Sequence, residues 1–162
     1  MRLNEGIEWA IHCCAILAVL PSGTSLKARD LAEFFDLPPA YLAKHLNALS
    51  AAGVITSKRG RSGGCRLARP AETITLLDIV EAVTGSHSTF KCTEIRRQGP
   101  CARADDAYPR PCGIARAMWR ADAAWRAELK AVTLDAIAHK GAQETPDSQR
   151  RRSVEWLGAR LK

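Results

Sequence analysis

The stretch PPAYLAKHLNALSAAGVITSKRGRSGGCRLARP, residues 38–70, decides the fold of this chain. Its first half places leucines at helical spacing after two prolines, which suit a first helical turn because they need no amide partner. After Gly53 the apolar period falls to two, so residues 54–56 and 65–68 are expected to be strands joined by the glycine-rich tip 58–64. The stretch therefore predicts a helix of the recognition type followed by a β-hairpin wing.

The residues before this stretch complete a helix-turn-helix. Residues 3–19 have the apolar spacing of an amphipathic helix, and a short helix capped by Thr24 or Ser25 ends before Pro38. The second helix of a helix-turn-helix enters the major groove of double-stranded DNA. On its polar side we expect three side chains to face the groove: Tyr41, Lys44 and His45.

Charge also points to DNA. The net charge is +7 and the pI about 9.4, and five basic residues with no acid lie between Ser57 and Arg69. A positive patch beside a helix-turn-helix favours DNA contact over a merely solvated hairpin. An aromatic content of 6% does not favour binding of single strands by base stacking. The wing residues that we expect to contact DNA are Lys58, Arg59 and Arg61.

Other classes of protein are not expected. No stretch approaches the ~18 apolar residues of a membrane span, and the apolar run 11–20 follows Glu5 and Glu8 where a signal peptide would be basic. We therefore expect a cytoplasmic protein that does not bind membranes. No phosphate-binding glycine loop or nucleophile motif is recognisable, so the chain is not expected to be an enzyme.

The rest of the chain divides into three segments after a winged domain of residues 1–85. A loop at 86–112 contains Cys92, Cys101 and Cys112. The dimerisation segment, residues 113–140, contains one helix over 113–138 that carries an apolar stripe. Residues 141–162 form a flexible tail with a short docking helix near its end. The helix is longer than one small domain needs, so its stripe is expected to meet a second protomer. The fold class is mainly α with a small β wing.

The cysteines and the first helix leave two readings open. In a reducing cytoplasm the three loop thiols could ligate a metal or an iron-sulfur cluster, or remain free, and Cys13 and Cys14 are expected to fill the core. Glu8 and His12 are four residues apart on one helical face, so they form either a chelating pair or a surface ion pair.

Four motifs together resemble the IscR and NsrR family of winged-helix transcription regulators. They are the helix YLAKHLNAL, the wing RGRSGGCRLARP, the following ITLLDIVEAV and a cysteine loop before a long helix, and they cover about residues 1–140. The resemblance implies a homodimer that binds a palindromic promoter site.

The cysteine spacing is similar to one branch of that family. Gaps of eight and ten residues between the loop cysteines, with Glu8-Trp9, His12 and CTEIR, look like the RsrR branch. That resemblance implies a two-iron, two-sulfur (2Fe-2S) cluster held by Cys92 and Cys112 with Glu8 and His12 of the partner subunit, a 4Fe-4S cluster being less expected. Cys101 could replace one thiolate, and the Trp9 indole could change rotamer when the cluster changes charge.

Two alternatives do not need an iron-sulfur cluster. One is a metal-free regulator or adaptor that acts through thiol oxidation or protein contacts. The other is a DNA-binding protein stapled by zinc, with the three loop cysteines and a histidine as ligands.

Overall fold

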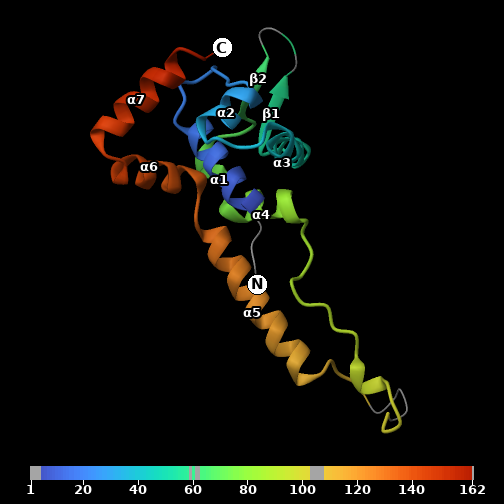
Figure 1. Ribbon diagram of the computed structural model, residues 1–162. Helices are drawn as coiled ribbons and strands as arrows, with labels where there is room; N and C mark the ends of the chain where they lie inside the picture. The colour runs from blue at the N-terminus through green and yellow to red at the C-terminus, as the bar shows by residue number, and fades with distance from the viewer. Residues whose placement is uncertain (1–4, 59, 61–62, 103–107, 162) are drawn as a thin grey trace.

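The computed structural model describes residues 5–58, 60, 63–102 and 108–161. In the described part of the chain, helices and one β-hairpin follow one another (Figure 1). The winged domain contains α1 (Glu5–Ala18), α2 (Ala28–Phe34), α3 (Pro39–Ala51), β1 (Ile55–Lys58), β2 (Gly64–Leu67), η1 (Ala71–Thr73) and α4 (Leu76–Thr84). The second half contains η2 (Ile95–Arg97), α5 (Gly113–Ala131), α6 (Leu134–Glu144) and α7 (Asp147–Gly158).

The predicted helix-turn-helix and wing are confirmed. β1 and β2 pair antiparallel from Ile55↔Leu67 to Lys58↔Gly64, and α3 ends before Gly53, whose φ of +69° suits a helix C-terminus. Leu26 adds an extended bridge to Cys65 through two backbone hydrogen bonds of 3.1 and 2.6 Å. Because Leu26 is extended, α2 begins only at Ala28, and the expected Thr24 or Ser25 cap is wrong.

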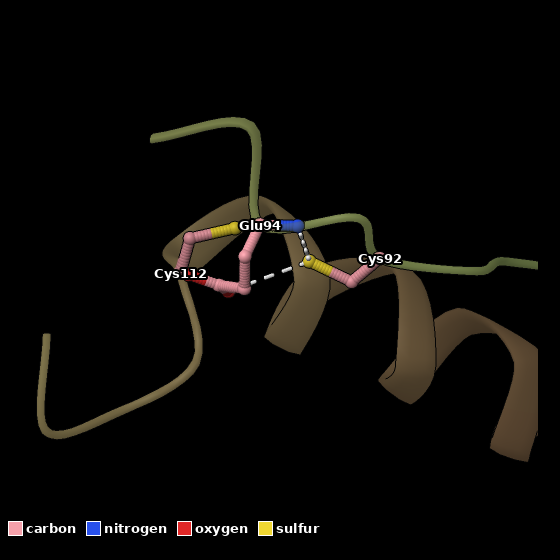
Figure 2. A group of neighbouring side chains, drawn as sticks. All are labelled: Cys92, Glu94 and Cys112. Carbon is pink, nitrogen blue, oxygen red and sulfur yellow. Dashed lines mark hydrogen bonds between the residues drawn. The ribbon is translucent and has the colours of Figure 1, made fainter. Parts of the chain in front are cut away.

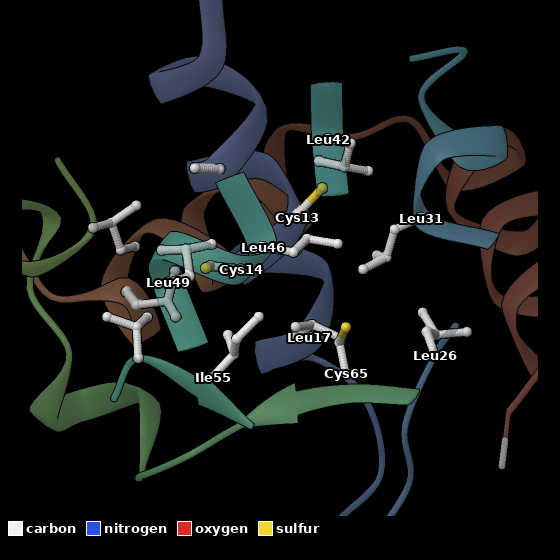
Figure 3. Close-up of a cluster of buried hydrophobic side chains, with 14 of the residues drawn as sticks. Cys13, Cys14, Leu17, Leu26, Leu31, Leu42, Leu46, Leu49, Ile55 and Cys65 are labelled. Atoms are coloured by element: carbon white, nitrogen blue, oxygen red, sulfur yellow. The ribbon is translucent and has the colours of Figure 1, made fainter. Parts of the chain in front are cut away.

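The core of the winged domain joins α1, α2, α3 and the hairpin (Figure 3). Cys13, Cys14 and Cys65 are fully buried among its leucines and isoleucines, so the expectation that Cys13 and Cys14 fill the core is confirmed. Burial raises the pKa of Cys13 to about 12, with a further contribution from the neighbouring Cys65. Burial also raises the pKa of Cys14 and Cys65. These thiols are therefore poor nucleophiles and poor ligands.

The helix expected over residues 113–138 is wrong, because the structure contains two helices there. α5 ends at Ala131, and Val132 and Thr133 are extended. These two residues pair with the entry to α4, where the Leu76 N–H donates to the Val132 carbonyl at 3.0 Å and the Leu134 N–H donates to the Ile74 carbonyl at 2.7 Å. Thr133 then caps α6 by accepting from the Ala136 N–H at 3.2 Å.

The flexible tail is also wrong in part. α6 runs to Glu144, and α7 begins at Asp147, well before the short docking helix that the sequence predicts. Leu157 is buried in the core, and the Trp156 ring lies 5.4 Å from the Phe34 ring of α2. α7 is therefore part of the folded domain, held by two apolar side chains on a mostly polar helix.

The long arm of the molecule is α5, which leaves the winged domain; the chain after α4 runs beside it and brings Cys92 to Cys112 at its far end (Figure 1). An ion pair between Arg126 and Glu81 fixes α5 to α4, and the Asp122 carboxylate accepts from the Thr89 hydroxyl at 2.7 Å. Among the described residues no helix is both long and apolar enough to cross a membrane.

Candidate functional site

Two of the loop cysteines meet at the start of α5. Cys92, Cys112 and Glu94 each offer one ligand atom, and these atoms all lie within 4.8 Å of one another (Figure 2). All three side chains are half-buried, whereas Cys101 is exposed and lies outside this group. The structure thus brings together the two thiols that the resemblance to the RsrR branch implies as ligands.

Backbone geometry holds each thiol in place. Cys112 is the N-cap of α5, and its sulfur accepts from the Ala115 N–H at 3.2 Å, as expected for a cysteine next to a helix N-terminus. Glu94 has a φ of +49°, which is uncommon for a residue with a side chain. The Glu94 backbone N–H donates to the Cys92 sulfur, 3.4 Å away.

The hydrogen bonds and charges around Cys92 have opposite effects on its pKa. The hydrogen bond from the Glu94 amide lowers the pKa of Cys92, but desolvation together with the Glu94 carboxyl and the nearby Cys112 outweighs it, so the pKa lies above its ordinary value. A hydrogen bond from Arg96 holds the pKa of Glu94 below its usual range. The Arg96 guanidinium reaches the Glu94 carboxylate at 2.7 Å and stacks 4.7 Å above the Tyr108 ring.

The surroundings leave room for a bound group. An open hollow of about 310 Å³ beside Cys92 and Glu94 is also lined by Tyr108 and Trp119. The buried Arg96 Nε has no acceptor among the residues that the structure describes. Two converging thiols with a spare N–H donor fit one edge of an iron-sulfur cluster, which is held by thiolates and tuned by hydrogen bonds to sulfur.

The remaining predicted ligands lie elsewhere in the protomer. Glu8 and His12 are exposed on α1, in the winged domain, and within one protomer they do not join the Cys92 group (Figure 1). The His12 ring lies 5.6 Å from the Phe35 ring beside α2, and the Trp9 ring lies 6.1 Å from the His45 ring of α3. Both side chains therefore contact the helix-turn-helix.

α5 has an exposed apolar face near its loop end. Ile114, Met118 and Trp119 are 72%, 42% and 39% exposed, and of the nineteen residues of α5 only Ala115 is buried. An exposed apolar patch of this kind is typical of an interaction surface.

The predicted DNA-contacting residues lie on the winged domain. Tyr41 is 67% exposed, Lys44 is exposed and His45 is half-buried on α3, and Lys58 is exposed at the end of β1. Arg59 and Arg61 lie outside the described residues. Of the described residues near the wing tip, the Gly63 N–H donates to the Gly60 carbonyl at 3.1 Å.

Glu94 and Arg96 belong to the cysteine site, although the sequence does not indicate them as members. Both belong to the CTEIR motif, in which Glu94 follows Cys92 by two residues. An acidic residue two positions from a cysteine would have been the available signal, but only the positive φ of Glu94 brings its carboxylate beside both sulfurs.

Comparison with known proteins gives the family. Residues 3–140 match the sequence model of Rrf2, described as an iron-dependent transcriptional regulator. The HTH-type transcriptional regulator Rv1287 of Mycobacterium tuberculosis strain H37Rv is 31% identical over 139 residues, which is 85% of this chain and 81% of that protein. YwgB of Bacillus subtilis, which has the same description, is 33% identical over 91 residues, or 56% of this chain and 58% of that protein.

Solved structures share the fold. CymR, the global cysteine regulator of B. subtilis, has a TM-score of 0.66 at 20% identity and covers 86% of this chain and 98% of its own. The oxidized form of Staphylococcus aureus CymR gives 0.62 at 24% identity over 91% and 99%. IscR of T. potens gives 0.64 at 18% identity over 92% and 96%. The predicted winged-helix class and the resemblance to IscR-type regulators are therefore confirmed, and the chain belongs to the Rrf2 family of transcriptional regulators, which are not enzymes.

Proposed function

We propose that this chain is a cytoplasmic, homodimeric regulator that binds double-stranded DNA and senses redox state or a reactive small molecule through a 2Fe-2S cluster. Its ligands would be Cys92 and Cys112 of one protomer with Glu8 and His12 of the partner subunit, as in the RsrR branch of the family. The observation that carries this proposal is the convergence of the Cys92 and Cys112 sulfurs beside Glu94. A 4Fe-4S cluster is less favoured because Cys101 lies outside this group.

A second protomer would complete the site. The exposed apolar side chains of Ile114, Met118 and Trp119 lie on the helix that carries Cys112, so a partner that covered them would also approach the thiols. Glu8 and His12 are exposed on α1, where they remain free to act as ligands for another subunit. When bound, the cluster would supply a one-electron change of charge at a potential raised by imidazole and carboxylate ligation.

The contacts of α1 offer a route from this site to DNA. Trp9 lies against His45 of the recognition helix, and His12 lies against Phe35. A movement of α1 would therefore reach both helices of the helix-turn-helix, and ~1 to 3 kcal/mol of coupling is enough for allosteric control. The two recognition helices of a dimer must lie ~34 Å apart on DNA, so a small rotation changes affinity.

Anaerobic purification tests the cluster. The protein should be coloured, with iron and sulfide in a ratio of about one to one and about two irons per protomer. His12→Ala and Glu8→Ala should alter or abolish the cluster spectrum, whereas His87→Ala and Glu5→Ala, which change exposed residues of the same types, should not. A colourless protein without iron, or an unchanged spectrum in His12→Ala, would contradict the proposal. A Trp9→Ala protein whose DNA binding still responds fully to reduction would remove Trp9 from the mechanism.

DNA binding is tested separately. Lys44→Ala should weaken binding to a palindromic promoter site and reduce the salt slope by ~1, because one phosphate or groove contact is lost. Arg59→Ala tests the wing in the same way. Lys140→Ala removes an equally exposed lysine from α6, outside the winged domain, and should leave both quantities unchanged.

The second candidate is a metal-free regulator controlled by thiol oxidation. It is favoured by the exposure of Cys101 and the half-burial of Cys92 and Cys112, and CymR has been solved in an oxidized form. Peroxide should then change the DNA affinity of the metal-free protein, and Cys101→Ser should abolish that response. The zinc-stapled alternative has less support, because among the described residues neither Cys101 nor a histidine joins Cys92 and Cys112.

A further inference from the structure

The Cys92, Glu94 and Cys112 side chains form a ligand set within one protomer (Figure 2). In the proposed cluster site Glu94 has no role, and the ligands come from two subunits. Yet the Glu94 carboxylate lies with both sulfurs inside a 4.8 Å group. Cysteine thiolates and carboxylate oxygens are both ligands of zinc, and thiolates also bind other metals of intermediate or soft character.

The three side chains are fixed before any ion binds. The Ala115 N–H holds the Cys112 sulfur, and the Glu94 N–H holds the Cys92 sulfur. The φ of +49° at Glu94 is an unfavourable conformation for a residue with a side chain, and such conformations gather at ligand sites.

The two oxygens of Glu94 have different partners. Oε2 accepts from Arg96 at 2.7 Å, while Oε1 lies 3.4 Å from the Cys92 sulfur. Arg96 thus orients the carboxylate in the way that residues around a metal site orient its ligands. Oε1 remains on the side of the thiols, where an ion could bind it.

Distance and charge both suit a small cation. Around a tetrahedral zinc ion with Zn–S bonds of ~2.3 Å, two sulfurs lie ~3.8 Å apart, so donors within 4.8 Å of one another need to approach by no more than ~1 Å. Two thiolates and a carboxylate carry three negative charges. A divalent ion leaves one, and the Arg96 guanidinium next to the site neutralises it.

We propose that Cys92, Glu94 and Cys112 bind one divalent ion, zinc or ferrous iron, within a single protomer. The ion displaces the two thiol protons to solvent, and a water in the adjacent hollow fills the fourth position. The site goes beyond the proposed function because it needs no partner subunit. It uses the same two thiols as the cluster, so the ion and the cluster exclude one another.

Cobalt is the probe, since Co²⁺ bound to thiolates absorbs visibly and takes zinc geometries. The full-length protein, reduced and freed of metal under anaerobic conditions, should bind one Co²⁺ per protomer with thiolate charge-transfer absorption. Glu94→Gln should weaken Co²⁺ binding by ~10- to 100-fold. Glu8→Ala, His12→Ala and Cys101→Ser should not, because these residues lie outside the group.

The results that overturn the inference are equally defined. They are an unchanged Co²⁺ affinity in Glu94→Gln, a loss of Co²⁺ in His12→Ala, or no thiolate band in the wild-type protein. Circular dichroism of Glu94→Gln should match the wild type, because the residue belongs to the loop and not to the core. Iron and sulfide content, measured on the same variants, tests the cluster separately, since that ligand set predicts loss in His12→Ala and retention in Glu94→Gln.

Discussion

Substitution of Leu157 by alanine tests whether α7 is part of the folded domain. Leu157 is 6% exposed and belongs to the core, although the helix around it is polar. Replacement of a buried leucine by alanine costs ~2–5 kcal/mol of unfolding free energy. Because Leu157 lies at the edge of the core, where neighbours can close in, we expect ~2–3 kcal/mol.

The same helix supplies the control. Val154 is 66% exposed, so Val154→Ala should change the unfolding free energy by less than ~0.5 kcal/mol. Urea denaturation, followed by circular dichroism at a fixed protein concentration, measures both variants. Trp156→Ala should also destabilise, because it removes the ring contact with Phe34 and the stacking of Arg160 at 3.7 Å. Equal midpoints for Leu157→Ala and Val154→Ala would refute the docking of α7.

Three further predictions concern the core, the wing and the cap of α4. With a pKa of about 12, Cys13 has ~1000-fold less thiolate than an ordinary thiol near pH 8. Mass spectrometry after alkylation of the native protein should therefore find the three core cysteines unlabelled and Cys101 labelled. Equal labelling of all four would contradict the burial. In Gly64→Ala the new Cβ would lie 2.9 Å from the Leu26 carbonyl oxygen, and this close approach should lower the unfolding free energy by ~1–3 kcal/mol. Gly141→Ala is the control: its new Cβ would have nothing within 4 Å, so the variant should be neutral or stabilising in the same urea assay. Desolvation raises the pKa of Asp78, but hydrogen bonds from Thr75 and Arg69 outweigh it and hold the pKa below its ordinary value. Asp78→Ala should therefore lower the unfolding free energy by ~1 kcal/mol at neutral pH, and by progressively less below about pH 4, where the wild-type carboxyl itself gains a proton. A difference that does not depend on pH would contradict this.

Local signals decided most of the winged domain in advance. The leucine spacing after Pro38 and Pro39, and the change of period after Gly53, depend on residues close in sequence, and they predicted α3 and the wing correctly. The cap of α2 was wrong because Leu26 pairs with Cys65, thirty-nine residues later. Sequence periodicity contains no signal for such a contact.

The errors in the second half have the same cause. The apolar stripe continues through Val132, but Val132 and Thr133 pair with Ile74 and the start of α4, so α5 ends there. Most residues of α7 are polar, so its composition predicts a flexible segment, whereas its stability depends on where Trp156 and Leu157 dock. Tertiary contacts overrode local preference in both places.

For the cysteine site, the sequence indicates that two loop thiols act together, but it does not indicate the geometry around them. The resemblance to the RsrR branch implies Cys92 and Cys112 as the thiolate ligands, and the structure places Cys112 beside Cys92. Glu94 could not be foreseen, because its position depends on one backbone torsion. Ligation by Glu8 and His12 remains a prediction, since it depends on a second subunit.

The Cys92 and Cys112 thiols lie at the end of α5 farthest from the winged domain (Figure 1), so under the proposed ligand set each cluster joins two subunits. This arrangement has a genetic consequence. A protomer with Cys92→Ser still offers an intact α1, and a protomer with His12→Ala still offers an intact loop. Each variant alone would lack every cluster, but a mixed dimer of the two would contain one complete site. Two inactive alleles should therefore complement one another in the same cell, which ligands drawn from a single chain could never do.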